Sequence, residues 1–253
     1  MPPANRVFTD QELADFSKDC MKLAMEALER GDVEAAKRWI RRQDETKDVI
    51  HDLYLHWITA LLSHVYDRWG EDEAVRSVRD TARNFSLPLL KQKTEMIREQ
   101  GVRAWVEAIV DIWRQHSMYP GMKIEEDDEK FVFTLNPCGS GGRLIDMRAY
   151  EGPFAYRKLR KPGPHTWGEK DMPIYCSHCP WVHEIFPLAE GGAGSQFWIH
   201  ASPFPKKPGD PCIHYVYKDP EKIPDRYYDR IEMTREPRRL PRSHGLEPEQ
   251  SGK

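Results

Sequence analysis

Two cysteines and two histidines fall within eight consecutive residues of this chain, in the stretch YCSHCPWVHE. Cys176 and Cys179 have the C-x2-C spacing with which two sulfurs hold one ion from a tight turn, and zinc prefers thiolate and imidazole ligands. His183 follows Cys179 by four residues, so it would reach the same ion if WVHE turns helically. The stretch therefore predicts a metal site, with zinc as the first choice.

Two kinds of metal site fit these residues. A closed site would add the remote Cys138 and Cys212 to Cys176 and Cys179, and would either brace the fold or hold an iron–sulfur cluster. An open site of Cys176, Cys179 and His183 would leave a fourth position for water, whose pKa a zinc ion lowers toward about 7. The sequence leaves both open.

Other residues near the cysteines have several interpretations. Glu184 follows His183 and could act as the general base of an open site. His178, His200 and His214 could belong to the site or to the core, and Cys212 and His214 would share one face of a strand. Buried cysteines without a metal, or a redox dithiol of Cys176 and Cys179, are alternatives, although no βαβ pattern surrounds the C-x2-C motif.

A glycine-rich turn follows Cys138 in the stretch NPCGSGGRL. Gly139, Ser140, Gly141 and Gly142 could converge their backbone N–H groups into an anion-binding nest, and Arg143 could bind a substrate carboxylate. The turn matches neither the Walker nor the dinucleotide-binding fingerprint. A tight turn that brings Cys138 to the metal is the simpler interpretation, and both can hold.

The composition narrows the class of protein. The 253 residues carry a formal net charge of −3, which gives no electrostatic signature of nucleic-acid binding. No apolar run approaches the roughly 20 residues that cross a bilayer, and MPPANRVFTD lacks the features of a signal peptide. We therefore expect no membrane partner and a cytoplasmic location, where the five cysteines stay reduced.

The first half of the sequence predicts helices. Thr9 and Glu12 form a capping-box pattern before a helix at about 10–30, and further helices are expected at about 32–44, 46–69, 71–84 and 87–100, with a last one around Trp105–Trp113. Short joining segments favour an antiparallel bundle. Five tryptophans here fit either the core or the interface of a homo-oligomer.

The helix at 46–69 has the clearest pattern. Its apolar residues recur at helical spacing and predict a buried stripe of Ile50, Leu53, Tyr54, Trp57, Ile58, Leu61, Val65 and Trp69. Asp52, His56, Ser63 and His64 fall on another side. They would line a cleft if the second half docks there, with Asp52 orienting His56 as a proton carrier, or they would simply face solvent.

The second half of the sequence has strand patterns instead of helical ones. FVFTLN, EIFPLA, QFWIHA and CIHYVYK read as strands between segments rich in glycine and proline, and the acidic run Glu125–Glu129 reads as a solvated loop. The sequence thus predicts an α+β protein with a helical bundle at 1–119, a metal-binding β-containing domain at 120–233 and a disordered tail at 234–253.

The motifs PCGSGGRL, YCSHC and PCIHYVYKDPEKIPDRYY, within residues 130–230, resemble an uncharacterised family of bacterial proteins. A helical half followed by a cysteine-bearing half also resembles, more distantly, the aminothiazoline carboxylate hydrolase-like family. That likeness implies hydrolysis of a small acid with a C–N or C–S bond, and it transfers no catalytic residue.

These observations converge on a zinc-dependent hydrolase or lyase for a small anionic substrate. Cys176, Cys179 and His183 would hold the metal, with Cys138 or Cys212 as alternative ligands. The rival hypothesis is a non-catalytic module in which a structural zinc or iron–sulfur site braces the second half and the helices bind a ligand or partner.

Overall fold

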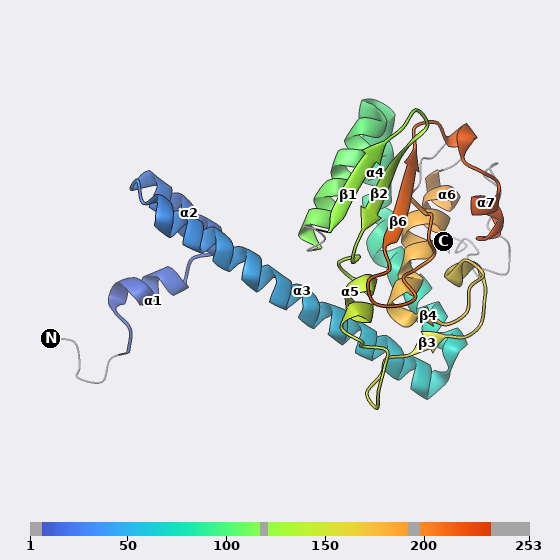
Figure 1. The fold of residues 1–253 in the computed structure, drawn as a ribbon, viewed down its shortest axis with the longest axis horizontal. Coiled ribbons are helices and arrows are strands. Elements are labelled where there is room, and N and C mark those ends of the chain that lie inside the picture. The colour runs from blue at the N-terminus through green and yellow to red at the C-terminus, as the bar shows by residue number, and fades with distance from the viewer. Residues whose placement is uncertain (1–6, 117–120, 192–197, 234–253) are drawn as a thin grey trace, which may run out of the picture. The chain divides into compact units, whose positions relative to one another are not determined.

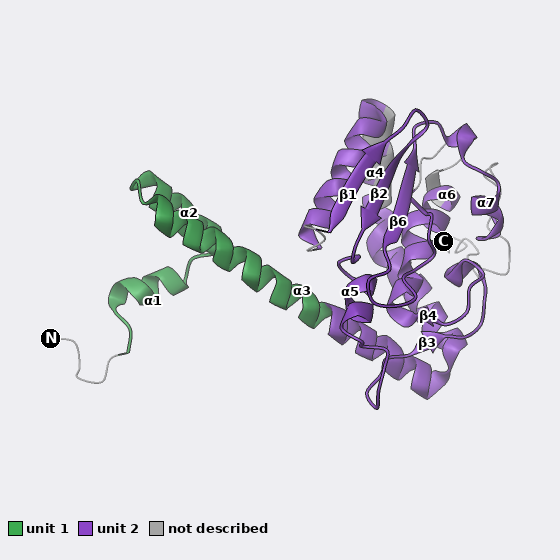
Figure 2. Cartoon of the chain, in the orientation of Figure 1, with its two compact units in different colours: residues 1–54 green, residues 55–253 purple. Residues whose placement is uncertain are grey.

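The computed structural model describes residues 7–116, 121–191 and 198–233 and shows an α+β protein, as expected. Contacts divide the chain into two compact units, residues 1–54 and residues 55–253 (Figure 2). The boundary lies inside the helix α3 (Val33–Trp69), whereas the sequence texture had suggested a division near residue 119. The two units are described in turn.

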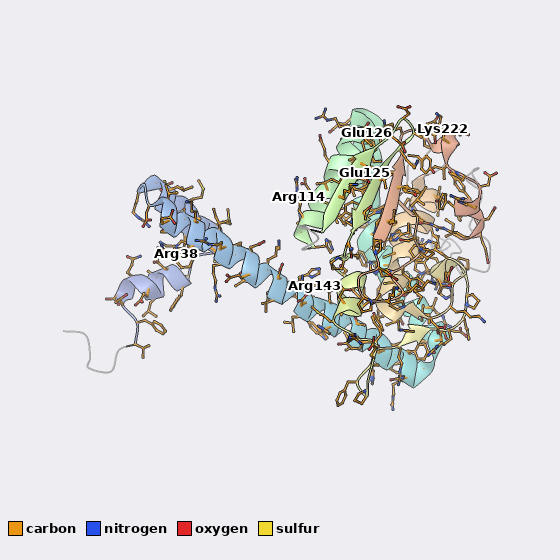
Figure 3. All side chains as sticks on the ribbon, viewed as in Figure 1. Arg38, Arg114, Glu125, Glu126, Arg143 and Lys222 are labelled. Atoms are coloured by element: carbon orange, nitrogen blue, oxygen red, sulfur yellow. The ribbon has the colours of Figure 1, made fainter. Side chains whose placement is uncertain are left out.

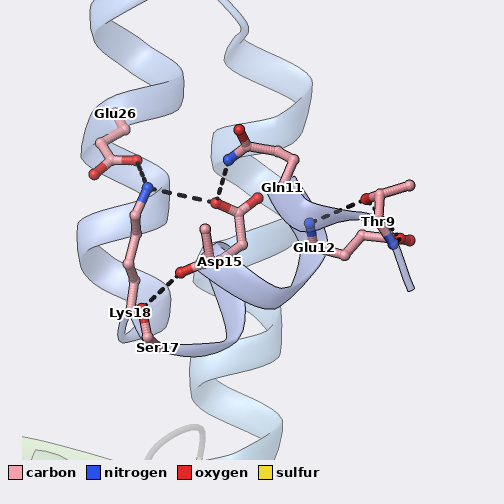
Figure 4. Close-up of polar contacts among 8 residues, drawn as sticks. Thr9, Gln11, Glu12, Asp15, Ser17, Lys18 and Glu26 are labelled. Atoms are coloured by element: carbon pink, nitrogen blue, oxygen red, sulfur yellow. Dashed lines mark hydrogen bonds and ion pairs between the residues drawn. The ribbon is translucent and has the colours of Figure 1, made fainter. Parts of the chain in front are cut away.

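The first unit consists of α1 (Asp10–Phe16), α2 (Cys20–Glu29) and the first part of α3. The capping box of Thr9 and Glu12 is confirmed. The single helix expected at 10–30 is wrong, because Asp19 caps a new helix by accepting a hydrogen bond from the Lys22 N–H. Lys18 joins the two helices through its ion pairs with Asp15 and Glu26 (Figure 4).

Helix α3 runs without the break expected between residues 44 and 46. At this point Thr46 donates its hydroxyl hydrogen to the carbonyl of Arg42, four residues earlier, which is compatible with an uninterrupted helix. The helix expected to end at residue 44 therefore continues to Trp69, where Gly70 adopts a positive φ of 90° and stops it.

The apolar stripe predicted on α3 is exposed rather than buried. Trp57 and Leu61 have exposed fractions of 59% and 53%, and the exposed part of the stripe comprises Ile50, Leu53, Tyr54, Trp57, Ile58, Leu61 and Trp69. The opposite side is buried through Leu55, Thr59 and Ser63. The polar groups of that side have partners, because Thr59 bonds the Leu55 carbonyl and Ser63 accepts the backbone N–H of Arg157.

Helix α4 (Glu71–Gln115) covers the three helices expected after Gly70: the first two are continuous, and the break expected before the last one occurs at Gly101. Pro88 lies inside it instead of beginning a new helix. Gly101, with φ of 81°, interrupts the helical geometry and changes the direction of the last turns.

The sheet of the second unit is antiparallel, with strand order β1-β2-β6-β5; β1, β2 and β6 are labelled in Figure 1. Its strands are β1 (Met122–Glu126), β2 (Lys130–Leu135), β5 (Ile199–His200) and β6 (Cys212–Tyr217), and a separate pair is formed by β3 (Lys158–Leu159) and β4 (Met172–Pro173). The strands predicted from FVFTLN and CIHYVYK are confirmed. Glu125 and Glu126 lie on the edge strand β1 and are exposed (Figure 3).

Short helical segments fill the rest of the second unit. They are α5 (Gly141–Asp146), η1 (Pro164–Thr166), η2 (Ile174–Ser177), η3 (Pro180–Ile185), α6 (Phe186–Gly191), η4 (Pro220–Lys222) and α7 (Arg226–Asp229). The strand predicted from EIFPLA is wrong, because these residues belong to η3 and α6. A short apolar run does not distinguish a strand from a buried helix.

Two hydrophobic clusters join the helices to the sheet. In one, Trp105, Ile109 and Trp113 of α4 pack against Phe133 and Val216. The other joins Leu55 and the α4 residues Ala74 and Val78 to residues beyond position 140. The helices of residues 55–115 therefore share their core with the sheet and do not form a separate bundle.

Among the helices of the described residues, none has both the length and the apolar character that crossing a membrane requires. The tail expected at 234–253 lies outside the described residues.

Candidate metal centre

A small cavity of about 80 Å³ in the second unit gathers four of the five cysteines and half of the histidines. We call it the thiol cavity. Its sulfur and imidazole groups belong to Cys138, Cys176, Cys179, Cys212, His116, His178, His183, His200 and His214. The fold thus collects side chains that are up to about a hundred positions apart in the sequence.

The helical turn η3 and the sheet position the central histidines. Residues 180–185 form a wide π-helical turn directly after Cys179, which brings His183 back over that cysteine, as the sequence predicted for a helical WVHE. The pairing of β5 with β6 places His200 opposite His214. Cys212 and His214 are both buried, on one face of β6, as expected.

Two groups of side chains are close enough to hold an ion. The ligand atoms of Cys179, His183 and His200 lie within 4.8 Å of one another, and so do those of His200, Cys212 and His214. His200 belongs to both groups. Cys176 and Cys138 belong to neither, although the sequence suggested them as ligands.

Trp198 decides the protonation of His214. The indole N–H of Trp198 donates a hydrogen bond of 2.5 Å to Nδ1 of His214. Because an indole nitrogen can only donate, Nδ1 must keep its lone pair, and the neutral ring carries its proton on Nε2. Burial lowers the pKa of His214 to about 3, so the ring is neutral. Nε2 is buried without a hydrogen-bond partner in the described structure.

His183 and His200 form a close imidazole pair. Nδ1 of His183 lies 2.7 Å from Nε2 of His200, and the two rings stack at an interplanar angle of 10°. The other face of His183 stacks on Trp198 at 4.0 Å between ring centroids. Burial, together with the neighbouring His214 and His183, lowers the pKa of His200, and its Nδ1 is buried without a hydrogen-bond partner in the described structure.

Glu184 connects the segments that carry these histidines. Its fully buried carboxylate accepts hydrogen bonds from the indole N–H of Trp167, the backbone N–H of His200 and the guanidinium of Arg230. Burial raises the pKa of Glu184 to about 7, although Arg230 acts in the opposite direction. Glu184 is not among the described residues that line a cavity, so this geometry favours a positioning role over the predicted role of general base.

The glycine-rich turn surrounds the sulfur of Cys138. Hydrogen bonds from the Cys212 thiol and from the backbone N–H groups of Gly142, Ser140 and Gly141 lower the pKa of Cys138 to about 6, against the opposing effect of burial. Ser140, Gly141 and Gly142 of the predicted anion nest line the thiol cavity, and their backbone N–H groups favour the thiolate form of Cys138. A Cβ built on Gly141 would overlap Cys176 Sγ, which explains the absence of a side chain there.

The segment 174–185 also contributes Cys176, His178 and Cys179 to the wall of the thiol cavity. Burial raises the pKa of both thiols. Nδ1 of His178 lies 2.6 Å from the carbonyl oxygen of Tyr175, so this nitrogen donates and Nε2 keeps its lone pair. That Nε2 lies 3.6 Å from Cys179 Sγ.

A larger cavity of about 420 Å³ adjoins the thiol cavity. We call it the apolar cavity, since most of its wall consists of Ile58, Leu62, Val78, Ala82, Phe85, Leu89, Trp105, Val182 and Pro187. The two cavities share six residues in their walls, namely Ile112, His116, Tyr175, His178, His183 and Trp198. Among the described residues that line them, no lysine or arginine occurs.

The remaining predicted site residues lie elsewhere. His56 faces Tyr156, with 2.8 Å between Nδ1 and the phenol oxygen, and it lines neither cavity. His64 is exposed, and Asp52 belongs to the first unit. Arg143 lies on α5 (Figure 3) and lines neither cavity. The polar side of α3 is covered by the segment around Tyr156 and Arg157 instead of lining a cleft.

Trp198, Trp167 and Arg230 were not among the site residues predicted from the sequence. Trp198 and His200 are two positions apart, so a strand places them on one face, as it does Cys212 and His214. That alternation was a usable signal. Arg230 follows Glu184 by 46 positions, and no local pattern links the two.

No family model matches the chain, and neither the curated proteins nor the solved structures contain a significant match. The resemblances drawn from the motifs therefore stay predictions.

Proposed function

We propose that the protein is a zinc-dependent hydrolase or lyase whose ion is held by Cys179, His183 and His200. The observation that carries this proposal is that the ligand atoms of these three residues lie within 4.8 Å of one another. One of the three residues, His183, also lines both cavities. Catalytic zinc sites use three protein ligands and keep a fourth position open. A zinc ion there would supply an activated water or polarise a carbonyl group of the substrate.

The tautomer of His214 favours this group of ligands over the alternative. A ligating imidazole nitrogen needs its lone pair, but Nε2 of His214 carries a proton while Trp198 bonds Nδ1. In the group of His200, Cys212 and His214, His214 therefore has no free lone pair for an ion, and only two ligands remain. Nδ1 of His183 faces Nε2 of His200 at 2.7 Å, and Sγ of Cys179 lies 3.6 Å from Nε2 of His178. Neither of these contacts involves a group that can only donate a hydrogen bond.

The His183–His200 pair must open slightly to admit an ion. Two nitrogens bound to one tetrahedral zinc lie roughly 3.3 Å apart, given Zn–N distances of about 2.0–2.1 Å. The observed 2.7 Å is the length of a hydrogen bond. Binding would therefore replace the shared proton, and we expect zinc uptake to release protons.

The substrate is proposed to be a small organic molecule with an apolar body. Such a body fits the wall of the apolar cavity, and its reactive group would then reach His183 in the shared wall. The anionic substrate expected from the sequence has less support, because the described lining of the thiol and apolar cavities carries no lysine or arginine.

His178 is the proposed proton carrier in place of Glu184. It lines both cavities, and the Tyr175 carbonyl holds its ring with the lone pair on Nε2. A neutral imidazole in that tautomer accepts a proton, as a general base must.

The test combines metal analysis with matched variants. Wild-type protein, Cys179→Ser, His183→Gln and the control Cys212→Ser would be purified without added metal, checked for folding by circular dichroism, and analysed for bound metal. We expect about one zinc per chain in the wild type and in Cys212→Ser, and a loss in the other two variants. Loss only in Cys212→Ser would contradict the ligand assignment.

Catalysis is tested separately with His178→Gln. Turnover would be screened with small apolar esters, amides and thioesters on zinc-loaded protein. We expect the variant to keep its zinc while kcat falls by roughly a factor of 100 or more. Loaded wild-type protein that turns over none of these classes, with four sulfurs around the ion, would instead favour the structural zinc module.

A further inference from the structure

A third cavity of about 250 Å³ lies in the second unit and differs from the other two in its charge. We call it the basic cavity. Its charged lining consists of five cations, Arg148, Lys158, Lys170, Lys206 and Lys207, and two carboxylates, Glu151 and Asp171. This excess of positive charge contrasts with the formal net charge of −3 of the whole chain.

Three of these cations have no carboxylate partner. The ion pairs that engage the other charged lining residues are Arg148–Glu151, Lys206–Glu169 and Arg160–Asp171. Among the described residues, no carboxylate pairs with Lys158, Lys170 or Lys207. Lys158 is half-buried on β3, with its Nζ 5.9 Å from the ring centroid of Tyr150. The cavity therefore holds ammonium groups whose charge the protein itself leaves unbalanced.

Hydrogen bonds hold the loop that carries two of the lysines. The carboxylate of Asp210 accepts the backbone N–H groups of Lys206 and Lys207. The carboxylate of Asp146, which belongs to α5, accepts the backbone N–H of Gly209. This side of the basic cavity is therefore fixed to the rest of the second unit before any ligand binds.

The opposite parts of the wall contain strained backbone. Arg148 and Asp171 have φ angles of 55° and 60°, in the left-handed region that residues other than glycine rarely adopt. They are two of the four described non-glycine residues with a positive φ, and both line the basic cavity. Strain of this kind is concentrated at functional sites, where the surrounding structure maintains it.

We propose that the basic cavity binds a small organic phosphate, whose phosphate group lies among the ammonium groups of Lys158, Lys170 and Lys207. The organic part would contact the apolar lining residues, which are Ile145, Tyr150, Pro173, Phe204 and Pro205. This proposal does not rest on the proposed function, because none of these residues is an assigned zinc ligand.

The arrangement of the three lysines favours a phosphate over a carboxylate. They come from three separate segments, since Lys158 lies on β3, Lys170 precedes β4 and Lys207 precedes β6. A phosphate monoester carries about two negative charges and three terminal oxygens, so it can meet donors from several directions. A carboxylate offers one charge and two oxygens. Lysine binds phosphate as a compact point charge, which needs no fixed fork geometry.

The shape of the site favours a small molecule. The lysines surround a concave space with an apolar wall, which is the usual form of a small-molecule site. Phe204 and Pro205 line the thiol cavity as well as the basic cavity. The proposed phosphate site therefore adjoins the candidate metal centre, and the experiment must separate the two.

The test is calorimetric titration of full-length protein with phenyl phosphate at low ionic strength, where screening is weak. We expect saturable binding of one equivalent. Lys158→Gln and Lys207→Gln should each weaken binding by about tenfold or more, because each removes a charged donor. Glu151→Gln removes a carboxylate from the wall and should strengthen it. The control Lys222→Gln makes the same charge change on η4 (Figure 3), outside the cavity, and should have no effect.

The remaining arms identify the ligand and its place. Benzoate, which carries the same ring on a carboxylate, should bind more weakly than phenyl phosphate, and equal affinities would overturn the assignment to phosphate. Cys179→Ser should bind phenyl phosphate like the wild type, whereas loss of binding in this variant alone would place the anion on the metal. Equal weakening by Lys222→Gln, or no saturable binding at all, would exclude the site. Lys207 is exposed, so its variant decides the matter even if Lys158→Gln fails to fold.

Discussion

The indole N–H of Trp198 donates to Nδ1 of His214 across 2.5 Å. The predicted consequence is a neutral His214 ring with its proton on Nε2. Histidine ¹⁵N–¹H correlation spectra should therefore show the Nε2–H tautomer for this residue. Trp198→Phe, which removes the donor, should release the ring from this single tautomer. An Nδ1–H tautomer in the wild type would contradict the ligand assignment as well.

His214 should also make stability depend on pH. Its folded pKa of about 3 lies below the usual value of 6.5, so the unfolded state binds a proton first as the pH falls. The contribution of His214 to the free energy of unfolding should be fully present above about pH 6.5. It should decrease below that pH, with a loss of about 4 kcal/mol at pH 3. Denaturant unfolding at several pH values measures the slope. His214→Gln should flatten it, and an unchanged slope would show that His214 is protonated in the folded protein.

The ion pair of the buried Glu184 and the partly buried Arg230 should be strongly coupled. Arg230→Met leaves the buried Glu184 carboxylate without its counter-ion, and Glu184→Gln leaves the partly buried guanidinium of Arg230 without one, which costs up to about 3–5 kcal/mol. Glu184→Gln and Arg230→Met should each destabilise the protein by about that much, whereas the double variant should cost clearly less than the sum. Urea unfolding of all four proteins completes this cycle, and additive effects would exclude the coupling.

Gly141 should not tolerate a side chain. The methyl group of Gly141→Ala would overlap Cys176 Sγ, so we expect a loss of about 1–3 kcal/mol of unfolding free energy. The double variant with Cys176→Ala removes the overlapping sulfur and should recover part of that loss. Thermal unfolding compares both with the Cys176→Ala single variant, and the absence of any recovery would mean that the clash lies elsewhere.

Asp127 should titrate far below an ordinary aspartate. The ammonium group of Lys130 and the backbone N–H groups of Glu129 and Lys130 lower the pKa of Asp127 to about 2. Because the folded pKa is depressed, the stabilisation by this turn is present above about pH 4 and is lost as the pH falls toward 2. An NMR titration of the Asp127 carboxyl carbon measures the midpoint. A midpoint near 4 would show that the turn does not form these bonds.

The sequence predicted those features that depend on local pattern. Thr9 and Glu12 predicted the start of a helix, and the alternating pattern of FVFTLN predicted the strand β2. The helical turn between Cys179 and His183 also followed from spacing. In each case the residues that decide the structure lie within a few positions of one another.

Features that depend on distant partners could not be predicted. The apolar stripe of Trp57 and Leu61 obeys the helical period, yet the side with Thr59 and Ser63 is buried because other segments satisfy its polar groups. Periodicity identifies an apolar face and does not identify what covers it. The role of Glu184 likewise depends on Arg230, which only the folded chain brings near.

The most direct test of the zinc site is X-ray absorption at the zinc edge of protein loaded with one equivalent of zinc. The ligand set of Cys179, His183 and His200 predicts one sulfur at about 2.3 Å, two nitrogens at about 2.0–2.1 Å and one further light atom. Four sulfurs would mean a closed structural site, and a protein that binds no zinc would contradict the metal centre altogether.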